Sequence, residues 1–434
     1  MNEILKLDAV ALISEVQSKR ISHRDVCEAY IERIAQKETD VGAFIHFDPD
    51  QVRSVADGLD KQQATGPLAG LPVGVKDVID TVDMPTGYGT DAYSGSRPVW
   101  DAPCVTQSKS AGALIMGKTV STEFAMASPG ETRNPWSPAH TPGGSSSGSC
   151  AAVASGMALM GFGTQTAGSI IRPASYCGVV GYKPSFGLLE PAEIKVLSHS
   201  LDTLGIVTRS VRDAALIVSV LSGRSGLALS RTPCSAPRVG LFRTPPFDMS
   251  EPATEAALDH AIARIEAAGG TVVEIDVPED FVTTHDLHAA VMGWEVTRAL
   301  SHERTVLWDQ LTQVTRDFLT EKAKVTALDY DAALAALPLI KTSLAGAMTD
   351  VDVLLAPSAA GAAPKGLAST GAPTFNSPWT LLHMPALSVP AILDVGLLPV
   401  GVQVIGRVGD DARTLEISAW IEACLDAPKA KDFL

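Results

Sequence analysis

Residues 141–169 read TPGGSSSGSCAAVASGMALMGFGTQTAGS, and this segment constrains the fold more than any other part of the chain. Two glycine-rich turns, each with a serine, flank a run of small, mostly apolar residues of helical character. A flexible linker between domains has no need of such a run. Glycine allows close backbone approach and unusual dihedral angles, which suits a site where main-chain amides converge. The segment therefore predicts a packed site rather than a tether.

The composition is that of a folded protein of enzyme size. Of 434 residues, 46% are hydrophobic and only 19% are charged, so the chain can bury a large core. The formal net charge is -15 and the isoelectric point is about 5.0. Nucleic acid and anionic membranes would repel such a protein, so neither is expected as a partner. A small molecule is the expected partner, and homodimer formation stays open.

The first residues and the cysteines predict a cytoplasmic protein. MNEILKLDAVALISEVQSKR places acidic residues among apolar ones, unlike a signal peptide. No apolar run reaches the roughly 18 to 20 residues that a membrane helix needs. The six cysteines are far apart and include no C-x-x-C pair. We therefore expect reduced thiols, with no disulfide framework and no zinc site.

Short apolar strands alternate with helical segments along the chain. Helical spacing covers residues 1–65, where Ser22 is a predicted N-cap with Asp25 three residues later. Further helices are predicted at 150–160, 255–268, 286–337 and from residue 412. Strands are predicted at 73–75, 113–120, 177–185, 239–242, 272–275, 351–357, 385–391 and 399–407. The pattern favours an α/β fold with a single large mixed β-sheet layered by α-helices, as one domain over 1–434 with a mainly helical variable region at 250–340.

One short motif within the serine-rich turn suggests a different kind of hydrolase. GGSSSGS satisfies G-x-S-x-G with Ser146 at its centre, as in an α/β-hydrolase esterase with a Ser-His-Asp triad. That motif requires a strand that leads directly into the turn. The preceding NPWSPAHTP contains three prolines, which do not fit a central strand. We retain this hypothesis as an alternative.

A longer comparison carries more information than the short motif. Residues 143–185 read GGSSSGSCAAVASGMALMGFGTQTAGSIIRPASYCGVVGYKPS. They resemble the defining segment of the amidase signature family, which is approximately GGSSGGS, an alanine- and glycine-rich helix, GTDxGGSIRxPA and CGxxGxKPT. Weaker similarity extends to LAGLPVGVKD, GKTVSTEF, NPW, APS, PALSVPA and PVGVQVIGR. The resemblance covers most of the chain and implies the fold of that family and hydrolysis of amides, without a cofactor or a metal.

The resemblance implies catalytic roles for three residues. Ser169 matches the nucleophile, Ser145 matches the serine that relays its proton, and Lys76 in GVKD matches the base. The Gly144–Ser145 peptide bond is expected to be cis. The oxyanion hole is implied at the backbone amides of Thr166, Ala167, Gly168 and Ser169. Ser146 is expected to fix the relay by a hydrogen bond.

These residue types suit the chemistry. A serine hydroxyl attacks a carbonyl only when a base takes its proton. Lysine serves when burial disfavours its ammonium form and lowers its pKa. A hydroxyl between lysine and nucleophile passes the proton in either direction, so it also protonates the leaving amine. An acyl-enzyme on Ser169 is then hydrolysed by water.

The second turn departs from the family pattern at three positions. Gln165 stands where aspartate is common, and Ile171 stands where arginine is common. Because relatives can pair these two charges, loss of both leaves neither stranded, so we do not expect inactivation. Ala167 replaces a glycine and adds a methyl group at the oxyanion turn.

Other candidate sites are weaker. His285 and His288 in HDLH could suggest a metal, but a pair at this spacing on a polar helix is more often exposed. His302 begins HERTVL, which lacks the second histidine of H-E-x-x-H. The substrate pocket is expected at residues 121–131 and 374–384 and near Trp294 and Trp308, because loops vary in such folds.

The predicted function is hydrolysis of a small carboxylic amide or a related carbamate, ester or urea. A first alternative is the amidase-like A subunit of a glutamine-dependent tRNA amidotransferase, which passes ammonia to a partner. The serine esterase that uses Ser146 is a second alternative, and a non-catalytic binding scaffold is a third.

Overall fold

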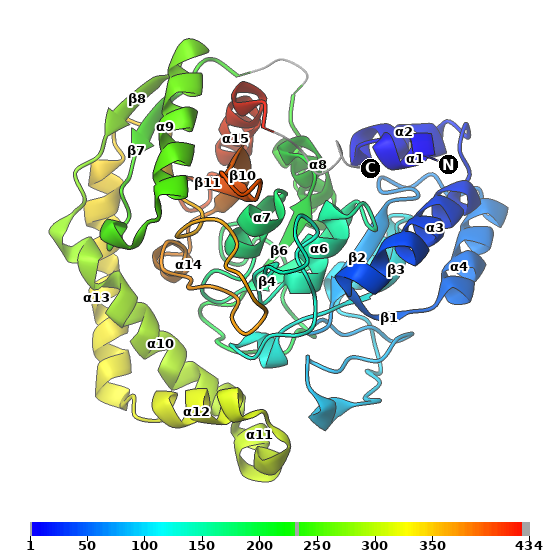
Figure 1. Cartoon of the computed structure of the whole chain (residues 1–434), viewed down its shortest axis with the longest axis horizontal. Coiled ribbons are helices and arrows are strands. Elements are labelled where there is room, and N and C mark those ends of the chain that lie inside the picture. Colours follow the sequence, from blue (N-terminus) through cyan, green and yellow to red (C-terminus); the bar gives the residue numbers. More distant parts are fainter. Residues whose placement is uncertain (1, 231–233, 428–434) are drawn as a thin grey trace.

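One sheet of 11 strands forms the centre of the fold (Figure 1). The computed structural model describes residues 2–230 and 234–427. The strands are β1 (Phe44–Phe47), β2 (Pro72–Lys76), β3 (Leu114–Thr119), β4 (Met160–Gln165), β5 (Val180–Lys183), β6 (Thr203–Thr208), β7 (Arg238–Leu241), β8 (Thr271–Glu274), β9 (Val353–Pro357), β10 (Ala386–Leu393) and β11 (Pro399–Ile405). Their order is β1-β3-β2-β4-β6-β5-β10-β11-β9-β7-β8. The predicted α/β fold with one large mixed sheet is confirmed.

Parallel and antiparallel pairs alternate in blocks across the sheet. β2 runs parallel to β3 and β4, and β7 runs parallel to β8 and β9, whereas the remaining neighbours are antiparallel. Strands β2, β4, β5, β6, β9 and β11 are buried along their full length. Strands buried on both faces show no polar alternation, which explains their continuous apolar runs.

The helices lie on the sheet and around its edges. They are α1 (Asn2–Lys6), α2 (Ala9–Gln17), α3 (His23–Val41), α4 (Pro49–Lys61), α5 (Pro103–Ser110), α6 (Ser147–Ala154), α7 (Ile171–Cys177), α8 (Val211–Leu221), α9 (Pro252–Ala267), α10 (Thr284–Ala299), α11 (Ser301–Val306), α12 (Gln313–Lys322), α13 (Ala327–Ala347), α14 (Ser377–Leu381) and α15 (Asp411–Leu425). α6 packs on β2 and β4, and α7 packs on β5, β10 and β11. Within the described residues, no helix is long and apolar enough to cross a membrane.

The first 65 residues and the small-residue run differ from the prediction in detail. The Ser22 and Asp25 capping box is present, but strand β1 interrupts the predicted helical region. The helix predicted at 150–160 ends at Ala154, because Gly156 takes a left-handed conformation with φ +71°. Met160 instead begins β4. The sequence analysis missed β4 and β6, since glycines interrupt their patterns.

Glycine in α6 allows the close packing that the small-residue run predicted. A Cβ at Gly148 would lie 2.3 Å from the Ala43 carbonyl oxygen and 2.3 Å from the Val120 nitrogen. Such distances are shorter than any ordinary contact. α6 can therefore pack against the backbone just before β1 and just after β3 only because position 148 has no side chain.

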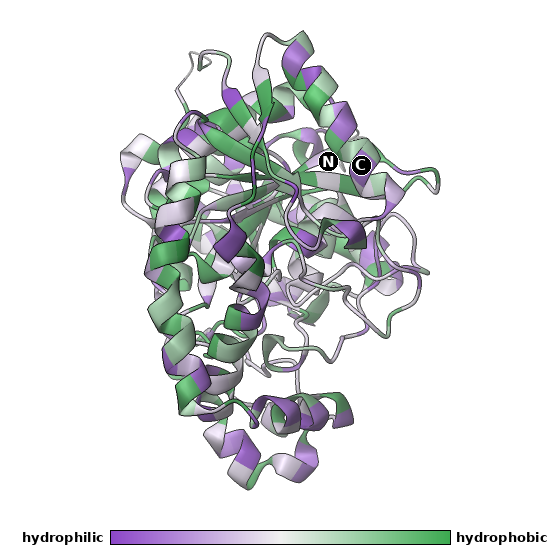
Figure 2. Cartoon of the chain, turned by 90° about the vertical axis from the view of Figure 1, so that its left-hand side faces the viewer, coloured by the Kyte–Doolittle hydropathy of each residue, from purple (hydrophilic) through white to green (hydrophobic). Residues whose placement is uncertain are grey.

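Helices α10–α13 form the mainly helical region and extend along one side of the molecule (Figure 1). Figure 2 shows hydrophobic strands through the middle of the molecule and more hydrophilic residues on the helices at its lower edge. α10 contacts α12, α13 and α14. The region thus contacts α14, which lies next to the turn at residues 166–169.

Candidate active site

Strand β2 ends in a lysine that lies beside two hydroxyl groups. Lys76 is fully buried, and its Nζ is 2.8 Å from the Ser145 Oγ and 2.8 Å from the Thr164 Oγ1. Thr164 is in β4, whose parallel pairing with β2 brings it to the same end of the sheet. Ser145 lies in the turn before α6. The sheet thus brings together a lysine and a serine that are 69 residues apart in sequence.

The surroundings of Lys76 favour its neutral form. Burial disfavours the ammonium ion and lowers the pKa of Lys76 from 10.5 to about 7, against the opposing charge of Asp202. The Asp202 carboxylate accepts hydrogen bonds from the Thr166 hydroxyl and from two backbone amides. Among the described residues, no carboxylate forms an ion pair with Lys76. Such an amine can take up a proton near neutral pH.

The turn that carries Ser145 is held by a buried arginine. The Gly144–Ser145 peptide bond is cis, as predicted. Arg172 donates from Nη2 to the Gly144 carbonyl at 2.7 Å and from Nε to the Thr370 carbonyl at 2.8 Å. Burial lowers the pKa of Arg172 to about 10. The guanidinium therefore joins the serine turn to the segment between β9 and α14.

In the turn between β4 and α7, residues 166–169, the backbone carbonyls are hydrogen-bonded and the backbone amides are not bonded to any described residue. Each of the four carbonyls accepts a hydrogen bond, in chain order from the Nε2 of His288, the hydroxyl of Thr380, the amide of Arg172 and the amide of Ser146. Among the described residues, no acceptor is present for the four amides. Buried backbone amides are nearly always paired, so a run of unpaired ones is unusual and suits an anion.

Ser169 provides the last of these four unpaired backbone amides. Its side chain is 9% exposed, and its hydroxyl has no partner within the described part of the chain. Between residues 146 and 185, only Ala167 is more than minimally exposed. The turn therefore meets solvent at Ala167 and Ser169, and the added methyl group of Ala167 lies at that opening.

Ser146 is not positioned as either hypothesis about it expected. It is fully buried, and its hydroxyl contacts the Thr164 carbonyl at 3.4 Å instead of the Ser145 hydroxyl. Its amide donates to the Ser169 carbonyl at 3.3 Å, which joins the two serine turns. No strand leads into it, since β3 ends at Thr119 and α6 begins at Ser147. The α/β-hydrolase alternative with Ser146 as nucleophile is therefore wrong.

The two neutral substitutions add no buried charge of their own, although the neighbouring Arg172 is a buried cation whose Nη1 has no partner among the described residues. The Gln165 Oε1 accepts hydrogen bonds from the Ile170 amide at 2.9 Å and the Ile171 amide at 3.0 Å, at the start of α7. Its Nε2 donates to the Thr380 hydroxyl at 3.0 Å. Ile171 is fully buried in an apolar cluster. Gln165 thus satisfies its own polar atoms and caps a helix, as a neutral replacement should.

The segments expected to line the pocket approach the site to different extents. The Thr122 amide donates to the Ser145 carbonyl at 3.4 Å, so residues 121–131 do reach the serine turn. From residues 374–384, Thr380 contacts the turn at residues 166–169. Trp294 instead stacks on Tyr330, and Trp308 packs in a separate apolar cluster. α10 reaches the turn through His288, which the sequence analysis expected to be exposed and which is buried.

Sequence reasoning also missed two further buried lysines, Lys183 and Lys118, of which Lys118 pairs with the Asp77 carboxylate. Burial lowers the pKa of Lys183 to about 7, but its Nζ contacts only the Pro184 carbonyl, at 3.1 Å. Without a hydroxyl partner it lacks the arrangement seen at Lys76. Across the described residues, no group of three histidine, cysteine or acidic side chains could hold a metal ion. All six cysteines are free.

Comparison with known proteins places the chain in a family. The profile of the Amidase family matches residues 25–415, so the protein belongs to the amidase signature family, whose members are hydrolases of amide bonds. A solved structure of an amidase is 30% identical, with a TM-score of 0.86 over 96% of this chain and 100% of that one.

Two further relatives are named as subunits of an amidotransferase. The A subunit of the glutamyl-tRNA(Gln) amidotransferase from Chloroflexus aurantiacus is 31% identical over 96% of each chain. The A subunit of the same enzyme from Thermotoga maritima has a solved structure that is 28% identical, with a TM-score of 0.78 over 98% of this chain and 96% of that one. The chain is therefore similar both to amidases and to amidotransferase subunits.

Proposed function

We propose that the protein hydrolyses a small carboxylic amide, or a related C–N or C–O bond, through an acyl-enzyme on Ser169. The observation that carries the proposal is the run of four unpaired amides that ends at a free serine hydroxyl. The buried pair of Lys76 and Ser145 lies against it, tied through the Ser146 amide. A base, a relay and an oxyanion site are the parts that acyl transfer needs.

In acylation, the Ser169 Oγ forms a bond to the substrate carbonyl carbon. Its proton passes to Ser145, while the Ser145 proton passes to the neutral amine of Lys76. The carbonyl oxygen becomes an oxyanion that the amides of residues 166–169 stabilise. The same relay then returns a proton to the leaving nitrogen, so the C–N bond breaks and an amine or ammonia departs.

In deacylation, water replaces the departed amine. Lys76 and Ser145 take its proton, the resulting hydroxide equivalent attacks the acyl carbon, and the Ser169 Oγ recovers a proton as the acid leaves. The neutral lysine is regenerated at the end of the cycle. No metal or cofactor takes part in any of these steps.

The test is a screen of primary amides, anilides, carbamates and esters with the purified chain alone. We expect at least one class to be hydrolysed, and Ser169→Ala to abolish that activity. Hydrolysis that persists in both Ser169→Ala and Lys76→Ala would instead indicate another nucleophile. No hydrolysis by the chain, either alone or with added partner subunits, would favour the binding scaffold.

The named relatives favour a second candidate, a subunit of an amidotransferase. The 31% identity to the C. aurantiacus protein extends over nearly the whole of both chains. In that case the same site would release ammonia from glutamine for a partner subunit. The expectation that nucleic acid is not a partner would then apply to this chain by itself and not to the complex. Glutaminase activity that appears only when partner subunits are added would support this candidate over the first.

A further inference from the structure

The carbonyl side of the oxyanion turn is held by two side chains from distant parts of the chain. His288 in α10 lies 2.9 Å from the Thr166 carbonyl oxygen, and the Thr380 Oγ1 in α14 lies 2.9 Å from the Ala167 carbonyl oxygen. Both side chains are buried. We propose that His288 and Thr380 are positioning residues for catalysis, which aim the amides of Ala167 and Gly168 at the oxyanion; this rests on the proposed function.

The peptide group is planar, so fixing one of its ends fixes the other. In a trans peptide the carbonyl and the following amide point in opposite directions. A donor that fixes the Thr166 carbonyl therefore fixes the direction of the Ala167 amide. In the same way, a donor on the Ala167 carbonyl fixes the direction of the Gly168 amide. An oxyanion site depends on such prior alignment, because donors that must reorient during the reaction stabilise the transition state less.

The donor roles of both side chains are fixed by their neighbours. A carbonyl only accepts, so the His288 Nε2 carries the proton, and burial keeps the ring neutral by lowering its pKa to about 4. Thr380 has one proton. Its oxygen accepts a hydrogen bond from the Gln165 Nε2 at 3.0 Å, so its proton goes to a carbonyl. The Ala167 carbonyl at 2.9 Å is nearer than the Asn376 carbonyl at 3.4 Å.

Gln165 sets this orientation in turn. Its Oε1 faces the amides of Ile170 and Ile171 at the start of α7, so its NH₂ group must face Thr380. An aspartate at this position, when ionised, could only accept and would compete for the Thr380 proton. The neutral glutamine, the threonine and the Ala167 carbonyl thus form one directed chain of hydrogen bonds, which gives the unusual residue at position 165 a role in alignment.

The experiment compares isosteric variants with conservative ones. Thr380→Val and His288→Leu remove the donors, whereas Thr380→Ser and His288→Gln keep one. His285→Leu is the matched control, since His285 lies one turn earlier in α10 and its hydrogen bonds among the described residues go to Pro245 and Ser377, not to the turn at 166–169. The readouts are kcat and KM for the best amide from the screen, and inhibition by phenylboronic acid, which forms a tetrahedral adduct with serine.

Each donor removal should lower kcat and the affinity for phenylboronic acid about 10-fold, less than the roughly 10²–10³-fold cost of losing an oxyanion donor itself. KM should change by less than about twofold, and the conservative variants should recover most of the loss. Valine and leucine variants as active as wild type would overturn the proposal. So would serine and glutamine variants impaired to the same degree, since packing alone would then matter.

A fluorophosphonate probe separates this inference from the function on which it rests. If the wild-type protein is neither active nor labelled at Ser169, the proposed function fails and the alignment role falls with it. If the wild type is labelled but the donor variants are labelled at the wild-type rate, only the alignment role fails. Melting temperatures identify any variant that does not fold. If the variant at His288 or at Thr380 fails to fold, the variants at the other of these two residues test the proposal.

Discussion

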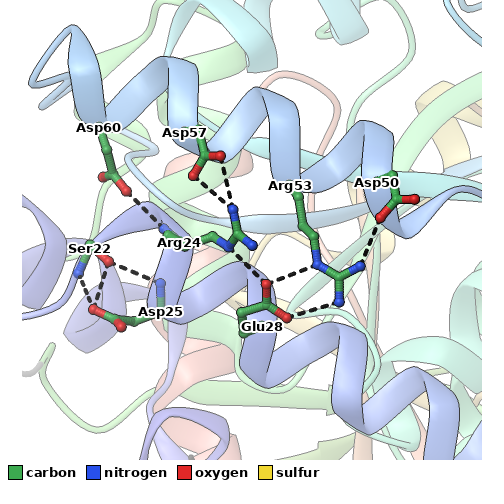
Figure 3. A network of polar contacts seen from close by, with 8 residues as sticks. All are labelled: Ser22, Arg24, Asp25, Glu28, Asp50, Arg53, Asp57 and Asp60. Atoms are coloured by element: carbon green, nitrogen blue, oxygen red, sulfur yellow. Dashed lines mark hydrogen bonds and ion pairs between the residues drawn. The ribbon is translucent and has the colours of Figure 1, made fainter.

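Basic side chains lie in two contrasting regions of this molecule, an exposed network of ion pairs and the buried candidate site. Between α3 and α4, Arg24 and Arg53 share the Glu28 carboxylate and also reach Asp57 and Asp50, in a network at the surface (Figure 3). At the site, Lys76 and Arg172 are buried, and their hydrogen bonds within the described part of the chain go only to hydroxyls and carbonyls.

The contrast shows how burial changes the proton affinity of a basic side chain. Solvent and nearby carboxylates keep the surface arginines charged, and their hydrogen bonds to acidic partners raise the pKa of both. At Lys76 the loss of water lowers the pKa instead. Exposed ion pairs contribute little to stability, whereas a buried amine near its pKa can exchange a proton. The predictions below test this difference.

The largest effect is expected at Ser169, the proposed nucleophile. Ser169→Ala should lower kcat/KM more than about 10³-fold, because the covalent route is lost and only binding and the oxyanion site remain. Steady-state kinetics with the best substrate would measure the change. Ser147→Ala, a matched serine outside the relay, should stay within about threefold of wild type. Equal loss in both variants would point to disturbed folding of the segment.

Removal of the lysine should be nearly as damaging. Lys76→Met should lower kcat by about 10³-fold, since no other base reaches Ser145. Lys183→Met is the control, because Lys183 has the same burial and the same pKa of about 7 without a hydroxyl partner. It should keep activity within about threefold. If the two variants lose activity alike, the base cannot be assigned to Lys76.

The pH dependence follows from the sign of the Lys76 shift. The folded-state pKa of about 7 lies below the usual 10.5, so the unfolded chain binds more protons between these values. Stability should therefore rise as pH increases from about 7 towards 10, and fall as pH decreases towards 7. Activity should also rise through pH 7 as the amine becomes neutral. Lys76→Met should reduce the slope of melting temperature against pH, which calorimetry would measure, and a slope equal to that of wild type would refute the shift.

Gln165 should matter mainly for stability. Gln165→Leu removes three hydrogen bonds and leaves the amides of Ile170 and Ile171 and the Thr380 hydroxyl without this partner. We expect a loss of about 2–4 kcal/mol in the free energy of unfolding, with reduced kcat. Urea denaturation would measure the loss. A stability unchanged from wild type would mean that water or backbone movement replaces the glutamine.

The smallest effect is expected at the surface network. Arg53→Met should cost less than about 1 kcal/mol of stability at low salt, and less still at high salt. Activity should not change, since Arg53 contacts only Glu28 and Asp50. Denaturation at two salt concentrations would test this. A loss comparable to that of Gln165→Leu would remove the contrast between the two regions.

Much of this arrangement could be predicted from sequence, and the remainder has clear causes. The mixed sheet, the Ser22 cap and the cis bond at Gly144 agree with expectation. Strand β4 was missed because MGFGTQ contains two glycines and directly follows a run of helix-forming alanines. A local pattern cannot report burial on both sides of a sheet, which here depends on strands far away in the sequence.

The site shows the same limit. The motif resemblance suggested Lys76, Ser145 and Ser169, and the structure brings the first two within hydrogen-bond distance. His288 and Thr380 could not be found, because they reach the turn across 122 and 213 residues of sequence. The HDLH pattern did draw notice to His288, but as a candidate metal ligand. Only the fold shows that its partner is a carbonyl.

The central claim is that Ser169 carries the acyl group, with Lys76 and Ser145 as its proton path. The most direct test is mass spectrometry of peptides after the enzyme is trapped with a fluorophosphonate or quenched during turnover of a slow ester. The account predicts one adduct, on the peptide that contains Ser169, whose rate of formation rises through pH 7 and falls sharply in Lys76→Met. An adduct on another residue, or unchanged labelling of Ser169→Ala, would contradict it.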